Sequence, residues 1–360
     1  MPATLHPEPR RLIYFRLMSR GLVRSFACAG ATIAVALAPS AAAAATGKSK
    51  PTTSSTPSAA ATSPRIAKGA VKVYLHDAFV VSHELVTVPH RVIHVDGVVR
   101  PYVPGQHVTL KAFEGARRIT VQRLEIRLSR NKTYGKFSGD LSVPNAGTVS
   151  VKVTHRRTLQ QLGFVSHRGI RVLEPSAGFG STGRFVQLIQ QRLAALHFYI
   201  PQTGVYDGGM GLALDAYHRL LGHGVSQSLD AATITDLLNG VGQFHIRYPK
   251  HGKHAEGDLS RQVLALIDKG KVVALYPISS GKPSTPTVLG SFHVYMKTPG
   301  YLPDGMYYSS FFTGGYAIHG FNPAPDYPAS HGCMRVPIVD AISIYNWLGV
   351  GDGVDVYYEH

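Results

Sequence analysis

Apolar and polar residues change their spacing along the chain, and these changes mark distinct regions. Between residues 68 and 175 the two kinds alternate in short runs, such as VKVYL at 71–75 and GTVSVKVTH at 147–155. Turn-forming sequences such as VPG and VPNAG separate the runs. Alternation over short segments predicts half-buried strands, so we expect a β-sandwich of the immunoglobulin-like kind at 68–175.

Residues 176–244 follow a helical period instead. Apolar residues recur on one face of the segment 184–200, and two further helices are predicted at 212–222 and 230–240. Asp230 stands at the start of the last segment, where a carboxylate often caps a helix. We therefore expect a small three-helix domain at 176–244, which can be a functional module or a helical spacer with an aromatic core.

Residues 245–360 return to strand patterns. Two strands are predicted around the turn at 268–270, a third at 290–297, a short apolar strand at 314–320 and a last one at 353–358. A single helix is predicted at 337–352. We expect a mostly β domain with one main helix, which makes the whole chain a multidomain protein.

The first 67 residues have a different composition. Five arginines between positions 10 and 24 precede an apolar run that ends in small residues near 41–45. This order is typical of a secretory signal, so we expect an exported, extracytoplasmic protein with a signal peptide at 1–45; an uncleaved membrane anchor is the alternative. Residues 46–67 are rich in Ser, Thr, Pro and Ala, which predicts a flexible linker.

Charge is distributed unevenly along the chain. The formal net charge is +16, and residues 65–175 carry 18 Lys and Arg against 7 Asp and Glu, whereas residues 245–360 carry nine of each. The basic excess would attract an anionic partner such as nucleic acid, anionic lipid or an anionic polymer, or it is a plain solvated surface. No nucleic-acid-binding motif accompanies it, so we expect no nucleic-acid partner. The histidines of this region lack the spacing of a metal site.

Candidate chemistry is concentrated in AIHGFNPAPDYPASHGCMRVP, at 317–337. Two His-Gly pairs occur there, and the second leads into Cys333; the other cysteine, Cys28, lies in the predicted signal. A lone thiol is an inert core group, an intermolecular bridge or a reactive group. Acyl transfer by a thiol needs a base, an orienting group and oxyanion donors. His319 can act as the base and the glycine-flanked turn can supply N–H donors. Arg335, two residues after Cys333, can hold a substrate carboxylate.

The same segment resembles the signature of a known family. His-Gly, a short loop, then Ser-His-Gly-Cys, an apolar residue and Arg is similar to the motif of the YkuD-type L,D-transpeptidases. The turn at 285–290 resembles that family's Thr-Pro-x-x-Gly turn with one extra residue, so the resemblance spans about 258–358. In the helical region, Gly204-Val205-Tyr206-Asp207 and its neighbours resemble a peptidoglycan-binding-like domain. The order of modules is similar to that of exported actinobacterial members.

The resemblance implies a role for each residue of the motif. Cys333 would be the nucleophile, His319 the proton donor and acceptor, and the carbonyl of Gly320 would orient the imidazole. The backbone N–H groups of Gly332 and Cys333 would form the oxyanion hole. The residues expected to shape the turn or bind substrate are Arg335, Ser330, His331 and Tyr308, with Tyr307 and Tyr316 as further candidates for the pocket wall.

The implied activity is cysteine acyl transfer in cell-wall biogenesis. The enzyme would release D-Ala from a peptidoglycan stem peptide, form a thioester on Cys333 and crosslink the third-position diamino acids of two stems. Two alternatives stay open: an L,D-carboxypeptidase that hydrolyses the same bond, and a non-catalytic wall-binding protein. The expected partners are donor and acceptor stem peptides, and neither a cofactor nor a metal is expected.

Overall fold

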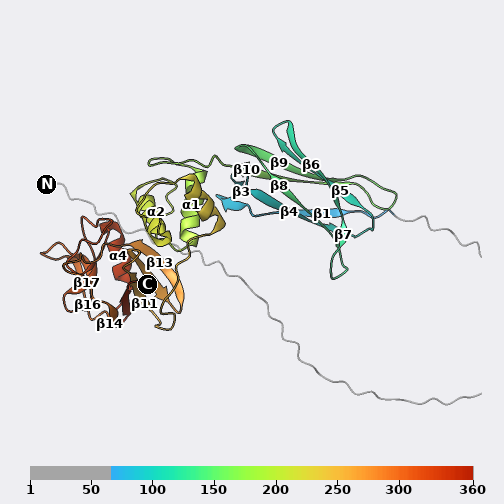
Figure 1. The fold of residues 1–360 in the computed structure, drawn as a ribbon. Coiled ribbons are helices and arrows are strands. Elements are labelled where there is room, and N and C mark those ends of the chain that lie inside the picture. The colour runs from blue at the N-terminus through green and yellow to red at the C-terminus, as the bar shows by residue number, and fades with distance from the viewer. Residues whose placement is uncertain (1–65, 360) are drawn as a thin grey trace, which may run out of the picture. The chain divides into compact units, whose positions relative to one another are not determined.

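The computed structural model describes residues 66–359 (Figure 1). The predicted signal peptide and the linker up to residue 65 lie outside the described residues. Within 66–359, strands dominate and four α-helices occur after residue 183. No helix in this described range is both long and apolar enough to cross a membrane.

Residues 67–172 form two sheets that share one apolar cluster. The smaller sheet has the strand order β1-β4-β8-β7, and the larger has β2-β3-β10-β9-β5-β6. The predicted alternation is present: in β9 the three valines 149, 151 and 153 are buried in the cluster, and the residues between them are not. The strands are β1 (Ala70–His76), β2 (Phe79–Val81), β3 (Glu84–Thr87), β4 (Val92–Arg100), β5 (His107–Glu114), β6 (Arg117–Glu125), β7 (Arg127–Leu128), β8 (Gly135–Ser142), β9 (Gly147–His155) and β10 (Phe164–Val172).

Three helices lie where the apolar spacing predicts them. They are α1 (Arg184–Ala195), α2 (Gly208–Leu221) and α3 (Ala231–Asn239). The cap predicted at Asp230 is present, because its carboxylate accepts the Thr233 N–H at 2.7 Å. The buried faces of the helices form a cluster that also includes Val263, Ala265, Ile267 and Leu275 of the following sheet.

Two more sheets and one helix make up the C-terminal part (Figure 1). A five-stranded sheet has the order β13-β12-β11-β19-β14, and a four-stranded sheet has the order β15-β16-β17-β18. Helix α4 (Ile338–Trp347) packs on β16 and β17. The strands are β11 (His254–Asp258), β12 (Val263–Asp268), β13 (Lys271–Pro277), β14 (Gly290–His293), β15 (Met296–Tyr301), β16 (Tyr307–Thr313), β17 (Tyr316–Gly320), β18 (Met334–Val336) and β19 (Gly353–Tyr357).

The prediction of a single strand at 290–297 is wrong. The chain there forms β14 in one sheet and β15 in the other. Val294, between them, is 1 % exposed and donates its N–H to Asp352, whereas the next N–H, that of Tyr295, is donated to Phe311. The apolar run therefore continues because the chain stays in the core while it crosses between sheets.

Strand β11 was hidden from the sequence pattern by its polar residues. His254, Glu256 and Asp258 alternate with small residues along this central strand, and all five positions are buried. A polar sequence of this composition is normally interpreted as an exposed turn and not as a buried strand. Its polar groups are satisfied inside the fold: the Glu256 carboxylate accepts the N–H groups of Arg247 and Tyr248 and the Tyr357 hydroxyl.

Candidate active site

A parallel strand pair brings the two halves of the motif together. β17 pairs with β18, and the register places His319 opposite Arg335. Cys333 comes immediately before β18. Residues far apart along the segment therefore become neighbours at one edge of the four-stranded sheet.

His319 is held in one orientation and is kept neutral. Its side chain is 2 % exposed, and Nδ1 lies 2.9 Å from the carbonyl oxygen of Gly320. A carbonyl can only accept, so Nδ1 carries the proton and Nε2 is a free acceptor. Burial lowers the pKa of His319 to about 4, the charge of Arg335 acts in the same direction, and the Gly320 carbonyl and Asp304 oppose the shift.

Cys333 is half-buried, and its Sγ lies 3.6 Å from the carbonyl oxygen of Gly315. Burial raises the pKa of the Cys333 thiol above its ordinary value, although a hydrogen bond with the Ala317 backbone and the charge of Arg335 favour the thiolate. At neutral pH the site therefore holds a neutral thiol and a neutral imidazole. An attack by this thiol would therefore have to remove its proton during the attack and not before it.

Ser330 fixes the turn that precedes Cys333. Its Oγ donates to the carbonyl of Cys333 at 2.6 Å and accepts the N–H of Gly332 at 3.0 Å. The Gly332 N–H, which was expected to serve the oxyanion hole together with the Cys333 N–H, therefore already has a partner in the folded chain. The hydroxyl of Ser330, two residues upstream, accepts the Gly332 N–H in a local hydrogen bond. The sequence motif alone does not reveal this bond.

Gly332 has a different role, which is steric. Its φ is +119°, a conformation that L side chains rarely adopt, and a Cβ there would lie 2.0 Å from Cε1 of Tyr316. The Tyr316 ring therefore packs directly on the Gly332 backbone. Gly320 is constrained in a similar way: a Cβ would lie 2.7 Å from the Cβ of Ala341 in α4.

Residues 278–282, which we call the strap, hold the Cys333 turn from the other side. The Ser280 carbonyl accepts the N–H groups of Ala329 and Ser330, both at 2.9 Å. Ser279 exchanges two backbone hydrogen bonds with Arg335, at 2.8 and 3.0 Å. The sequence suggested no role for the strap, because these contacts depend on pairing across the fold. Its SSG sequence directly after a buried strand was the available signal.

Two cationic side chains lie at the turn. The Arg335 guanidinium stacks on Phe321, with Cζ 3.9 Å from the ring centroid, and its buried Nε has no hydrogen-bond partner among residues 66–359. His331 is exposed, and its Nε2 lies 3.3 Å from Nζ of Lys282. Lys282 was not singled out in the sequence. It adds a second positive charge where a substrate carboxylate could bind.

Tyr308 does not join this group in the structure. It sits at an irregularity of β16 with a φ of 49°, and its ring contacts Tyr307 and Tyr345 of α4. The described contacts of Tyr308 are therefore those of aromatic packing. Tyr316 does contact the turn, because its ring packs on the backbone of Gly332.

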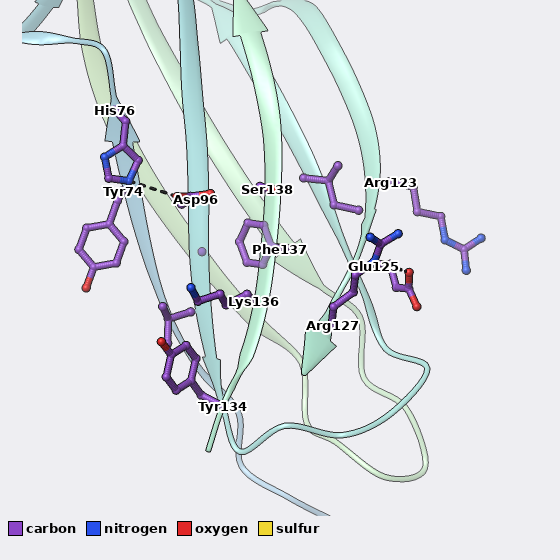
Figure 2. Close-up of a pocket in the computed structure, with 13 residues that line it drawn as sticks. Tyr74, His76, Asp96, Arg123, Glu125, Arg127, Tyr134, Lys136, Phe137 and Ser138 are labelled. Atoms are coloured by element: carbon purple, nitrogen blue, oxygen red, sulfur yellow. Dashed lines mark hydrogen bonds and ion pairs between the residues drawn. The ribbon is translucent and has the colours of Figure 1, made fainter. Parts of the chain in front are cut away.

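The described residues also include a hollow that shares no residue with the motif. It has a volume of about 730 Å³ and is lined by the smaller sheet and by β6 of the larger sheet, with Tyr74 and Tyr134 on one side and Arg123, Glu125 and Arg127 on the other (Figure 2). Within 66–359, no group of three or more His, Cys, Asp or Glu side chains is placed to hold a metal ion.

Comparison with known proteins identifies the C-terminal region. The sequence profile of the YkuD family, the L,D-transpeptidase catalytic domain, matches residues 252–356. No curated protein matches the chain. Among solved structures, an L,D-transpeptidase from Xylanimonas cellulosilytica is 31 % identical over 51 % of this chain and 100 % of its own, with a TM-score of 0.45.

Two further solved structures are more distant. An L,D-transpeptidase from Stackebrandtia nassauensis is 20 % identical over 51 % of this chain and 95 % of its own, with a TM-score of 0.33. The catalytic domain of the Enterococcus faecium enzyme, in a form acylated by ertapenem, is 27 % identical over 32 % of this chain and 100 % of its own, with a TM-score of 0.26.

Proposed function

Since this chain belongs to the YkuD family of L,D-transpeptidases, we propose that it crosslinks peptidoglycan stem peptides through a thioester on Cys333. The observation that carries the proposal is the arrangement of the motif: His319, with its Nδ1 bonded to the Gly320 carbonyl, lies across the strand pair from Arg335, two residues after the thiol. This arrangement presents a nucleophile, a neutral base and a cation at one sheet edge.

The acylation step begins from the neutral pair. As the Cys333 sulfur attacks the carbonyl carbon before the terminal D-Ala, its proton passes to Nε2 of His319. The Cys333 N–H is the backbone donor proposed for the oxyanion, since the Gly332 N–H is bonded to Ser330. The C–N bond then breaks, the leaving amine takes the proton from His319, and a thioester remains.

In the second step an amine of an acceptor stem attacks the thioester carbon. His319 takes a proton from this amine, the C–S bond breaks, and the Cys333 sulfur regains a proton. The product is an amide between the third-position diamino acids of two stems. Arg335, with a buried Nε that lacks a partner in the described structure, and Lys282 are the groups proposed to bind stem carboxylates.

The test uses a defined tetrapeptide stem and the whole chain. We expect release of D-Ala and a crosslinked dimer, and neither product with Cys333→Ala. Ertapenem should add its mass to the wild-type chain at Cys333, because the related Enterococcus faecium domain carries that adduct. Dimer formation by Cys333→Ala would overturn the assignment. Tripeptide as the sole product would favour the L,D-carboxypeptidase, and wall binding without acylation would favour a non-catalytic wall protein.

The proposal extends to the other parts of the chain. The signal-like N-terminus favours export to the cell wall, and the helices at 184–239 are proposed to be a peptidoglycan-binding-like domain next to the catalytic domain. The two-sheet region is proposed to be an immunoglobulin-like sandwich.

The two-sheet region is also proposed to bind anionic wall polymers, since Arg123, Arg127 and Lys136 line its hollow (Figure 2). Replacing Arg123 and Lys136 by Gln should reduce sedimentation with isolated wall, and added salt should weaken wild-type binding. Lys250→Gln, an exposed lysine of the C-terminal part, is the control. Wall binding that resists both salt and these substitutions would contradict the idea.

A further inference from the structure

Helix α2 carries a buried ion pair that faces the C-terminal sheets. Arg219 and Asp215 are one turn apart, and their side chains are only 6 % and 4 % exposed. Two contacts join them, Nη2 to Oδ2 at 2.6 Å and Nε to Oδ1 at 3.0 Å. A charged pair withdrawn from water this completely costs desolvation energy, so its remaining hydrogen bonds matter.

The third nitrogen of Arg219 reaches out of the helix. Nη1 donates to the carbonyl oxygen of Ile278 at 2.8 Å. Ile278 is the first residue of the strap and is 1 % exposed. Arg219 therefore fixes the near end of the segment that holds the Cys333 turn.

A continuous series of hydrogen bonds runs from that point to the nucleophile. Ile278 donates its N–H to the carbonyl of Gln262, whose side chain exchanges two hydrogen bonds with Ser280, both at 2.8 Å. Ser280 accepts the N–H of Ser330, and Ser330 bonds to the Cys333 carbonyl. The residues of this series that come before Cys333 are all buried: Arg219, Ile278, Gln262, Ser280 and Ser330.

The loop after His319 approaches the same helix. Ala324 and Pro325 surround one small gap together with Leu212 and Asp215 of α2. The negative charge of Asp326 also acts on Asp215, in the same direction as the burial that raises the pKa of Asp215. Both segments that flank the Cys333 turn therefore meet α2 near Arg219.

We propose that Arg219 is a positioning residue for acyl transfer: through Ile278 and the strap it sets the orientation of the Cys333 turn from the helical region. This inference rests on the proposed function, because its readout is acylation of Cys333. It differs from a purely structural role, in which the ion pair would only hold α2 against the sheet. Replacing both charged residues distinguishes the positioning role from the structural role. An apolar pair of similar volume often preserves the stability that a buried ion pair gave, so a remaining loss of acylation would come from positioning.

The experiment uses the whole chain with Arg219→Met and Asp215→Leu combined, and measures two rates at Cys333 by mass. Ertapenem acylation requires an oriented thiol, whereas iodoacetamide alkylation requires only an accessible one. We expect acylation to fall about 10- to 100-fold, because a small misplacement of a reacting group costs that much. Alkylation should stay within about twofold. Arg219→Lys, which retains a positive charge and N–H donors, should recover part of the acylation rate.

The matched control is Arg261→Ala. Arg261 also lies against the C-terminal end of α2, next to Gly222, but its side chain contacts Glu359 at the surface and none of the strap. It should leave both rates unchanged. A folded double variant that acylates at the wild-type rate would overturn the inference. If the double variant does not fold, a wild-type acylation rate in Arg219→Met or Arg219→Gln would overturn it equally. A wild-type chain that ertapenem does not acylate would instead contradict the proposed function.

Discussion

The ring of Tyr316 occupies the space that a side chain on Gly332 would need, since a Cβ there would lie 2.0 Å from Tyr316 Cε1. Tyr316 begins β17 and Gly332 precedes Cys333, so this contact joins the two halves of the motif. The positive φ of Gly332 adds a second constraint at the same position. The glycine of the His-Gly-Cys sequence is therefore required by the backbone path and by the ring above it.

Gly332→Ala should reduce acylation of Cys333 by about 100-fold, because the turn has to move away from Tyr316 and carries the thiol with it. The stability cost should be about 1–3 kcal/mol, as for other overpacked sites. Single-turnover acylation and denaturant unfolding measure the two effects. Gly208→Ala, at an open position of α2, is the control. Wild-type acylation by Gly332→Ala would show that the turn tolerates a Cβ.

The reactivity of Cys333 should rise toward alkaline pH without a plateau near neutrality. Burial raises the pKa of the thiol above its ordinary value of 9.0 and lowers the pKa of His319 to about 4, so no thiolate–imidazolium pair forms between these values. Iodoacetamide alkylation followed by mass from pH 5 to 10 measures this. A fast plateau below pH 7 would mean that the thiol is already ionised at rest.

Acylation by substrate should behave differently from alkylation. Its proposed base is neutral His319, which is already deprotonated above a pKa of about 4. The rate constant for acylation should therefore be level from about pH 5.5 to 8 and fall only at lower pH. If the rate constant for acylation instead fell with a midpoint near pH 6.5, the imidazole would be solvated and not buried.

Ser330→Ala should loosen the Cys333 turn without removing any reacting group. Two hydrogen bonds are lost, to the Cys333 carbonyl and from the Gly332 N–H. At about 1 kcal/mol each, the unfolding free energy should fall by about 2 kcal/mol. Chemical denaturation checks the loss, and Ser260→Ala, whose hydroxyl bonds to Glu359 near the C-terminus, is the comparison. Equal stabilities of the two variants would contradict the expected role.

Stability should depend on pH through the buried pair His254 and Glu256, which are 3.2 Å apart. Burial alone would lower the pKa of His254, but Glu256, the Gly252 carbonyl and Asp355 outweigh it and raise that pKa. For Glu256, burial acts upward but is outweighed by His254 and two backbone N–H groups, so the pKa is lowered. The His254 contribution is therefore complete below pH 6.5 and is lost as pH rises through its higher folded-state pKa.

The Glu256 contribution has the opposite sign. It is present above pH 4.5, the ordinary pKa of the carboxyl, and is lost as pH falls through the lower folded-state value. Unfolding measured at several pH values should give highest stability between about pH 4.5 and 6.5 from this pair. In His254→Gln the decline above pH 6.5 should be smaller. An unchanged decline would assign the loss of stability to groups other than this pair.

The sequence predicted much of the secondary structure, because its strands and helices follow regular apolar periods. β9 and the cap at Asp230 are as predicted. β11 was missed because its buried residues are polar, and the crossing at Val294 was missed because an apolar run does not record a change of sheet. Of the two strands that carry the motif, β17 was predicted from its apolar residues, whereas the three-residue strand β18 was not.

At the site, the motif located Cys333 and His319 but not what positions them. The Gly332 N–H was expected to be free and is bonded to Ser330. Arg219 bonds to Ile278 across 59 positions of the chain, and the strap bonds to residues 329–335 in the other half of the domain. Such contacts leave no periodic or local trace, so only the folded chain reveals them.

The apolar cluster shared by α1–α3 and by Val263, Ala265, Ile267 and Leu275 has a consequence for how such a chain can be recombined. A segment cut to the family match at 252–356 would expose the apolar residues of β12 and β13 that pack against the helices. The transferable cassette is therefore larger than the catalytic signature. Gene fusion that moves this chemistry to another protein has to carry the helices with it.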